Sequence, residues 1–594
     1  MFSRFARYER HIDLGAGLLL FALGFALNYF FAWQKSIIDL PDGGMVTDTA
    51  WRLVNGQIPY EDFGSIQGIG AALLEAPFIL IFGESLLPLV VHVSSVNGTA
   101  ALLCFAIMRM VGLRLPVALF FAVCTAIIFY TPLGMAFSIQ HGGFYALVAM
   151  TLGIWSEWKR PAWRLRVAAW VFCGIFLSLT LVSKVTAGFY FPAFLPLLFI
   201  EWQRTAVFKI LAVGTGAVLP FALILLFAND AAYTLQGILD YIIRLPGEYG
   251  GHRLKGSLND ALKVYEMSVT PTVLVTFGLF FVGLTYWFSI RKEQTGRFSA
   301  ILPGSVNGNM LLVVSGALLQ LGAVYVARIH DFTVYTMQQL VFVAGGMTFA
   351  GVANLFGSNE RELAEQTRRD LAIVARSLVA VIVFVAGFDA WWNHSNVNKN
   401  RGFKDMGSAF FARVQVPDEL VYPEIEGVRF REYHSRWLVE DVIGTDEIKK
   451  SLREDNAAIA FLRNYPDNVV LIGLDYIYYM YSGKPSPLPV ISVQPGASSP
   501  HHTSPLYPKT VARLRENFEK QDIRAALISD VRFEPLEAFI NDNGELFCSV
   551  DKHPYFYEVR FCDAEVRPKD WAVKMAHLVG MDGHFFGNSG PQRN

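Results

Sequence analysis

The sequence predicts a polytopic α-helical membrane protein of about eleven spans that ends in an extracytoplasmic α/β domain. Of its 594 residues, 53% are hydrophobic and only 17% are charged, whereas an average soluble chain carries roughly 25% charged residues. The shortage of charge ends near Asn393. We therefore expect a transmembrane domain over residues 1–393 and a water-soluble domain over residues 394–594, called the tail below.

Apolar runs of the length that a bilayer requires recur along the first domain. Arg4, Arg7 and Arg10 precede the first run, which is too long for a signal-peptide core. We expect spans near residues 14–33, 86–108, 116–131, 141–157, 167–183, 187–202, 207–228, 271–290, 308–327, 333–355 and 371–391.

The charges of alternate loops predict the orientation of the chain in the membrane. Cytoplasmic loops carry an excess of Lys and Arg. Counted from the amino end, every second loop is basic, whereas the short loops between them hold few cations, Lys184 and Arg328 among them. We therefore expect a bacterial inner-membrane protein with a cytoplasmic amino end and a periplasmic tail.

The tail alternates segments typical of helices and strands, which favours a small layered sheet. Helices are expected at 455–465, 476–481, 509–520 and 534–541, and strands at 468–473, 490–493 and 524–529. Cys548 and Cys562 flank a further strand pair and can form a disulfide on an oxidising side of the membrane; two reduced thiols are the alternative. No metal or other cofactor is indicated, and a net charge of −1 gives no reason to expect nucleic acid as a partner.

The loop after the first span carries the residues that are best suited to a catalytic role. Asp42 lies nine residues beyond that span, and Asp48, Glu61 and Asp62 follow. A carboxylate beside the bilayer can take a proton from an acceptor hydroxyl as the hydroxyl attacks a sugar carried on a lipid phosphate. Because the leaving group is already a phosphate, one base and cations to hold that phosphate are sufficient. The alternative is that such acids cap interfacial helices or face water.

The same loop resembles the GT-C superfamily of membrane glycosyltransferases. It is most similar to the protein O-mannosyltransferases, the lipid A aminoarabinose transferases and the rhizobial galacturonosyltransferase-like proteins. The matching positions are Asp42, Ala50, Trp51, Gly56, Pro59, Tyr60, Asp62, Phe63, Phe82 and Gly83. The resemblance covers roughly residues 14–90. Two positions depart from it: Gly43 replaces a common Glu, and Gly68-Ile69-Gly70 replaces Gly-Pro-Leu.

The resemblance implies that Asp42 is the catalytic base and that the donor is a polyprenyl-phosphate-linked sugar. The acceptor would be a lipid, polysaccharide or protein of the cell envelope. Contacts to the donor phosphate are expected from Lys184, His141 and Arg328. Arg244 and Arg253 lie in a second long outer loop, 229–270, which we expect to close over the donor. Asp48, Tyr60 and Asp62 are the first-loop candidates for acceptor contact.

Three alternatives remain open at the level of sequence. An O-antigen ligase or polymerase usually has its large outer loop late in the chain and lacks the Asp42–Phe63 pattern. A transporter should show paired repeats and interrupted spans at matching positions, and no clear repeat is visible. A non-catalytic binder of lipid-linked sugars is compatible with the departure at Gly43.

Overall fold

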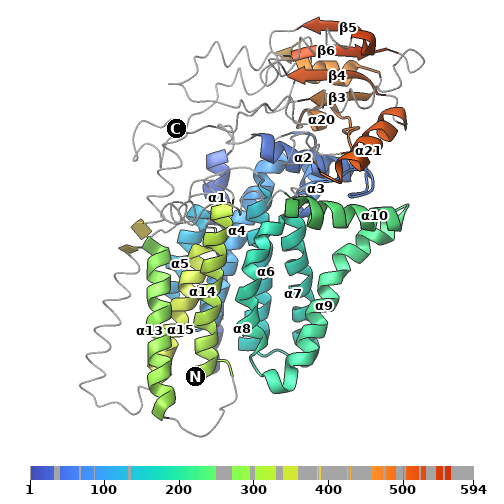
Figure 1. Cartoon of the computed structure of the whole chain (residues 1–594). Coiled ribbons are helices and arrows are strands. Elements are labelled where there is room, and N and C mark those ends of the chain that lie inside the picture. Colours follow the sequence, from blue (N-terminus) through green and yellow to red (C-terminus); the bar gives the residue numbers. More distant parts are fainter. Residues whose placement is uncertain are drawn as a thin grey trace, which may run out of the picture.

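A bundle of apolar helices, with a small sheet beyond one end, makes up the protein in the computed structural model (Figure 1). The structure describes residues 2–32, 40–65, 68–85, 87–130, 136–248, 271–293, 302–329 and 339–358, and tail residues 457–466, 468–472, 477–489, 500, 504–520, 523–529, 544–552 and 556–562, with four pairs at 384–385, 387–388, 424–425 and 428–429. The amino end lies at the end of the bundle opposite the sheet (Figure 1).

Most of the expected spans coincide with helices. The long helices are α1 (Phe2–Ala32), α4 (Leu87–Met110), α5 (Leu115–Ile128), α6 (Ser138–Trp158), α7 (Trp163–Ser183), α9 (Trp202–Phe227), α13 (Pro271–Glu293), α14 (Val306–Ile329) and α15 (Val341–Ser358). Within the described residues, five of them, α1, α4, α7, α9 and α14, are long and apolar enough to cross a membrane. The expected span at 371–391 and the proposed domain boundary at 393 lie largely outside the described residues.

The segment expected to span at 187–202 is not a regular α-helix. It forms a 3₁₀ helix, η1 (Val185–Phe194), followed by the single turn α8 (Leu195–Leu198). Pro192 and Pro196 each remove a backbone donor, which weakens an α-helix here. The packing of α14 accommodates the tighter helix: Ser315 Oγ donates to the carbonyl of Ala193 at 2.5 Å, and Gly322 lets α14 approach the backbone of Phe189.

Both long outer loops contain helices at the sheet end of the bundle (Figure 1). The first loop forms α2 (Leu40–Val54) and α3 (Gly70–Phe82). The second forms α10 (Ala231–Leu239), which Asp230 caps by accepting from two backbone N–H groups, and the π-helix η2 (Asp240–Arg244). The loop that we expect to close over the donor is therefore helical as far as residue 248, and residues 249–270 lie outside the description.

The described part of the tail contains a four-stranded sheet of order β3-β4-β6-β5. β3 (Asn468–Ile472) is parallel to β4 (Ile523–Ser529), and β6 (Phe556–Phe561) is antiparallel to both β4 and β5 (Phe547–Lys552). Helices α20 (Ile477–Ser482) and α21 (Tyr507–Lys520) agree with expectation, whereas the elements expected at 490–493 and 534–541 are not described. Cys548 and Cys562 form a disulfide across the β5–β6 pair.

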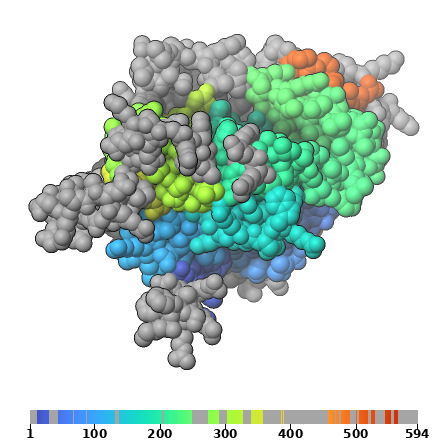
Figure 2. Space-filling view, turned by 90° about the horizontal axis from the view of Figure 1, so that it is seen from below, coloured from blue at the N-terminus to red at the C-terminus, as the bar shows by residue number. Residues whose placement is uncertain are grey.

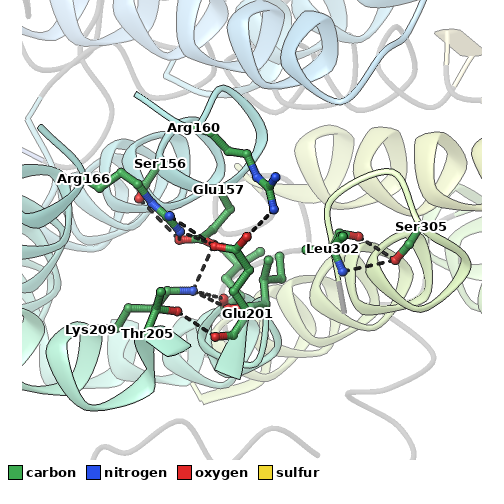
Figure 3. A network of polar contacts seen from close by, with 11 residues as sticks. Ser156, Glu157, Arg160, Arg166, Glu201, Thr205, Lys209, Leu302 and Ser305 are labelled. Atoms are coloured by element: carbon green, nitrogen blue, oxygen red, sulfur yellow. Dashed lines mark hydrogen bonds and ion pairs between the residues drawn. The ribbon is translucent and has the colours of Figure 1, made fainter. Parts of the chain in front are cut away.

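A buried ionic network lies at the end of the bundle away from the sheet. Glu157 on α6 pairs with Lys209 on α9 at 2.9 Å and with Arg166 on α7 at 3.1 Å (Figure 3). Glu201 pairs with both Arg166 and Arg160 (Figure 3). Glu157 and Lys209 are both fully buried, and Lys209 depends on Glu157 for its ion pair, whereas Glu157 also has Arg166.

We expect Glu157→Gln to lower the stability of the bundle by about 3–5 kcal/mol, because it leaves Lys209 charged and unpaired in the interior. The measurement is thermal unfolding of the purified chain in nanodiscs. The double variant Glu157→Leu with Lys209→Met removes both charges and should restore most of the loss. A single variant that is no less stable than the double variant would contradict this account of the network.

Candidate functional site

Helix α2 carries the predicted catalytic residue and lies between the bundle and the tail. Asp42 falls in its first turn, and the side chain of Asp42 is outside the description. Every residue from Gly43 to Arg52 is buried. One side of the helix packs on α3 and another on α20 of the tail, so α2 is fixed in place from two directions.

The first-loop motif, residues 50–63, holds a segment of the tail by its backbone. Four donors of the first loop each bond one carbonyl of residues 484–489: Trp51 Nε1 to Lys484 (2.9 Å), Gln57 Nε2 to Ser486 (3.1 Å), Arg52 Nη1 to Leu488 (2.6 Å) and the N–H of Gly64 to Pro489 (2.8 Å). The tail is thus docked through hydrogen bonds to its main chain, which the first loop supplies.

Asp48 is committed to a buried ion pair. Its Oδ2 accepts from Arg52 Nε at 2.8 Å, one helical turn along α2, and neither side chain is exposed. The guanidinium also lies 5.1 Å from the centre of the Phe63 ring. Burial raises the pKa of Asp48 to about 6, against the opposing effect of Arg52. Asp48 therefore neither faces water nor caps a helix, which were the alternatives for this acid.

Tyr60 and Asp62 shape the turn that follows α2. Tyr60 has a left-handed backbone, with φ of 68°, and its N–H donates to the carbonyl of Phe63 at 2.7 Å. Asp62 Oδ2 accepts from the N–H of Ile58 at 2.6 Å. Glu61 points the other way: its Oε2 accepts from the N–H of Asn229 and from Thr234 Oγ1, at 2.9 and 3.1 Å. The turn therefore joins the first outer loop to the second.

Gly68 and Gly70, in the segment that stands in place of Gly-Pro-Leu, permit a close backbone approach to the end of α7. A Cβ at Gly68 would lie 2.0 Å from the carbonyl oxygen of Val182, and one at Gly70 would lie 2.0 Å from Ser183 Oγ. The N–H of Ile69 donates to the same Val182 carbonyl at 2.8 Å. Lys184, the residue that follows α7, is half-buried at the turn into η1, so the first loop rests against the turn that carries it.

A chain of buried polar groups runs from α2 into the bundle. Thr47 Oγ1 donates to Glu75 Oε1 on α3 at 2.8 Å, and Glu75 Oε2 lies 3.7 Å from His92 Nδ1 on α4. His92 Nε2 lies 2.9 Å from His141 Nε2 on α6, and His141 Nδ1 lies 2.5 Å from Tyr130 Oη. Hydrogen bonds join α2 to α3 and join α4 to α6 and Tyr130, whereas Glu75 and His92 lie side by side without a hydrogen bond between them.

Sequence analysis missed Glu75, although it is an isolated acid within an apolar run, and such acids tend to have a function or a partner. Helix α3 has 13 residues, about 20 Å at 1.5 Å per residue, and is too short to span a bilayer. Burial raises the pKa of Glu75 to about 8, so the carboxyl tends to keep its proton near neutral pH.

The remaining predicted residues are placed as follows. His141 contacts His92 and Tyr130 inside the bundle. Arg244 is half-exposed and pairs with Asp240 at 2.6 Å. The side chains of Arg328 and Arg253 lie outside the description. Among described residues, no group of three or more His, Cys, Asp or Glu side chains is arranged to hold a metal ion.

No protein-family model matches the chain, and a search of curated proteins found no match. Among solved structures, the chain is similar to ArnT from Cupriavidus metallidurans. The crystal structure with undecaprenyl phosphate has a TM-score of 0.46 and 10% identity, and the apo structure has 0.45 and 10%; each match covers 93% of this chain and 99% of ArnT. The apo oligosaccharyltransferase of Archaeoglobus fulgidus has a TM-score of 0.38 and 12% identity, covering 90% of this chain and 71% of that one.

We expect Arg52→Lys to loosen the tail, because one ammonium does not reproduce the fork that bonds Asp48 and the Leu488 carbonyl together. A lost charge-assisted hydrogen bond is worth about 1.5–3 kcal/mol. Limited proteolysis of the tail should therefore be roughly tenfold faster or more, if opening is rapid relative to cleavage. Arg560→Lys, at an exposed pair within the tail, is the matched control. Equal cleavage rates in the two variants would show that Arg52 does not hold the tail.

Proposed function

We propose that the chain is an integral membrane glycosyltransferase that moves a sugar from a polyprenyl-phosphate donor to a cell-envelope acceptor. The observation that carries this proposal is the position of α2. The helix with Asp42 in its first turn is clamped between the tail and the bundle, and the loop that follows it rests on the turn at Lys184. In this proposal Asp42 is the base and Lys184 the cation, and the segments that carry them meet at one end of the bundle.

A bilayer is the setting that best explains the apolar surface. The 18-residue apolar window of α9 is only 11% buried, and Leu226 and Phe227 are 74% and 72% exposed. Seen from below, α9 and α10 form one flank of the molecule (Figure 2). Continuous apolar surface of this kind is rare on water-soluble proteins. We place the chain in a bacterial inner membrane with the amino end cytoplasmic and the tail periplasmic, following the loop charges.

The proposed reaction is a direct displacement at the anomeric carbon. The acceptor hydroxyl gives its proton to the Asp42 carboxylate as its oxygen forms the new bond to the sugar. The bond between that carbon and the lipid-phosphate oxygen breaks, and the lipid phosphate leaves with the bonding electron pair. Configuration inverts because attack and departure occur on opposite faces. Lys184 would offset the charge of the phosphate through a charge-assisted contact.

A second function, proton-coupled transport of a lipid-linked sugar, is favoured by one observation. Ionisable side chains within a helical bundle often mark proton pathways, and Glu75, His92 and His141 are adjacent and buried. Transport would move the lipid-linked sugar between leaflets without cleaving it. The transferase is preferred because transport gives no reason for a tail docked on the first outer loop.

We expect Asp42→Asn to lower the rate of sugar transfer by about 10²–10⁴-fold while the protein still folds, since the change removes the base but keeps its size. The assay uses the chain in nanodiscs with a polyprenyl-phosphate sugar and an envelope extract as acceptor. Glu84→Gln, an exposed acid of the same loop, makes the same chemical change as a control. Full activity in Asp42→Asn, or relocation of the intact donor between leaflets without cleavage, would contradict the proposal.

We expect Lys184→Ala to raise the apparent donor KM about tenfold to a hundredfold with little change in acceptor dependence. Arg328→Ala should act in the same direction. Lys184→Arg should retain most donor affinity, and Lys159→Ala, at the other end of the bundle, should have no effect. A nucleotide sugar alone should not serve as donor. Turnover with a nucleotide sugar, or a donor KM unchanged in both variants, would rule out the proposed donor site.

A further inference from the structure

A cavity of about 380 Å³ lies between the second outer loop and the tail, away from α2. Its volume falls within the range of roughly 300–1,000 Å³ that is typical of small-molecule sites. One wall is α10 with η2, and the opposite wall is α21, two elements that lie close together beside the sheet end of the bundle (Figure 1). The side chains that decide its chemistry are Tyr233, Asp240, Tyr241, Lys509, Arg513 and Glu516.

The inner wall of the cavity is held rigidly by the first outer loop. A Cβ at Gly237 would lie 2.3 Å from the carbonyl oxygen of Tyr60, and one at Gly64 would lie 1.9 Å from the ring of Tyr241. Both glycines thus allow α10 and η2 to pack directly on the turn after α2. Glu61 adds its hydrogen bonds to Asn229 and Thr234. A wall fixed in this way loses little freedom when a ligand binds, which favours affinity.

The cavity is lined by two tyrosines together with both hydrogen-bond donors and acceptors. The Arg513 guanidinium lies 5.2 Å from the centre of the Tyr233 ring, and Lys509 lies 3.7 Å from Asp240. Burial raises the pKa of Tyr241, so its hydroxyl stays neutral. Two cations face two carboxylates among the six side chains, so the lining has no excess charge to attract a phosphate.

We propose that this cavity binds a ring of an uncharged, hydroxyl-rich sugar. Such a ring has an apolar face for a tyrosine and hydroxyl groups that both donate and accept, which suits arginine beside carboxylate. The proposal rests on the proposed function in one respect, the identity of the sugar. If the chain is a transferase, the sugar bound here, beside the turn that follows α2, is part of the acceptor. Binding itself does not require the reaction.

The test is saturation-transfer NMR on the full chain in nanodiscs, with methyl glucoside and methyl galactoside as neutral probes and methyl glucuronoside as the charged probe. We expect saturation of the neutral ring protons in the wild type. Arg513→Gln removes the charged donor and Tyr233→Leu removes the aromatic face while keeping apolar bulk, so each should weaken binding about tenfold or more. Arg515→Ala, on the same helix but outside the cavity lining, should bind as the wild type does. Empty nanodiscs set the background.

Saturation of no neutral probe, equal saturation in Arg513→Gln and the wild type, or saturation of the glucuronoside alone would each overturn the assignment. Asp42→Asn separates this proposal from the proposed function, because it should lose transfer but keep sugar binding. A chain that transfers sugar but binds no neutral probe loses only the cavity assignment. A chain that binds the probe and cleaves no lipid-linked donor keeps the cavity and loses the transferase function.

Discussion

The ion pair between Asp48 and Arg52 is the interaction on which the arrangement of the sheet end depends. Two charges buried in an apolar interior are costly unless their remaining hydrogen-bonding groups are satisfied. Asp48 uses one guanidinium N–H of Arg52, and the carbonyl of Leu488 uses another. The tail therefore accepts a second buried hydrogen bond from the guanidinium that pairs with Asp48. Because Arg52 would lose this buried hydrogen bond without the tail, the fold of the loop and the docking of the tail are mutually dependent.

Close backbone contacts extend this dependence to the second loop and the bundle. Gly68 and Gly70 bring the first loop onto the end of α7, and Gly237 brings α10 onto Tyr60. Contacts at backbone distance have little freedom to adjust, since no side chain lies between the two segments. The turn after α2 thus fixes the relative positions of α7, α10 and the tail. It thereby also determines the shape of the cavity between α10 and α21.

Local sequence patterns predicted most helices and strands, whereas contacts between distant parts of the chain could not be predicted from them. Most of the long helices, together with β3 and β4, follow from apolar runs of the right length, whereas the 3₁₀ helix at Val185–Phe194 depends on how α14 packs against it. The first-loop motif was recognised as a family signature, yet Trp51 bonds a carbonyl 433 residues away, and nothing in its neighbours encodes that partner. Glu75 was missed for the same reason: its partners Thr47 and His92 lie on separate helices.

The structural role of the motif and a catalytic role for Asp42 are compatible, because they act on the same helix. Helix α2 is held through Arg52 by the tail, and through Thr47 by the chain that runs from Glu75 to His141. A catalytic group must be held to within about 0.5 Å of its productive position, and support on two sides of a rigid element is one way to achieve this. Trp51, Arg52 and Gln57 each bond the tail, and they would then affect the reaction only through the orientation of α2. In that case, substitutions at these three positions would act on the position of the site. The reaction itself would depend on the first turn of α2 and on the turn at Lys184.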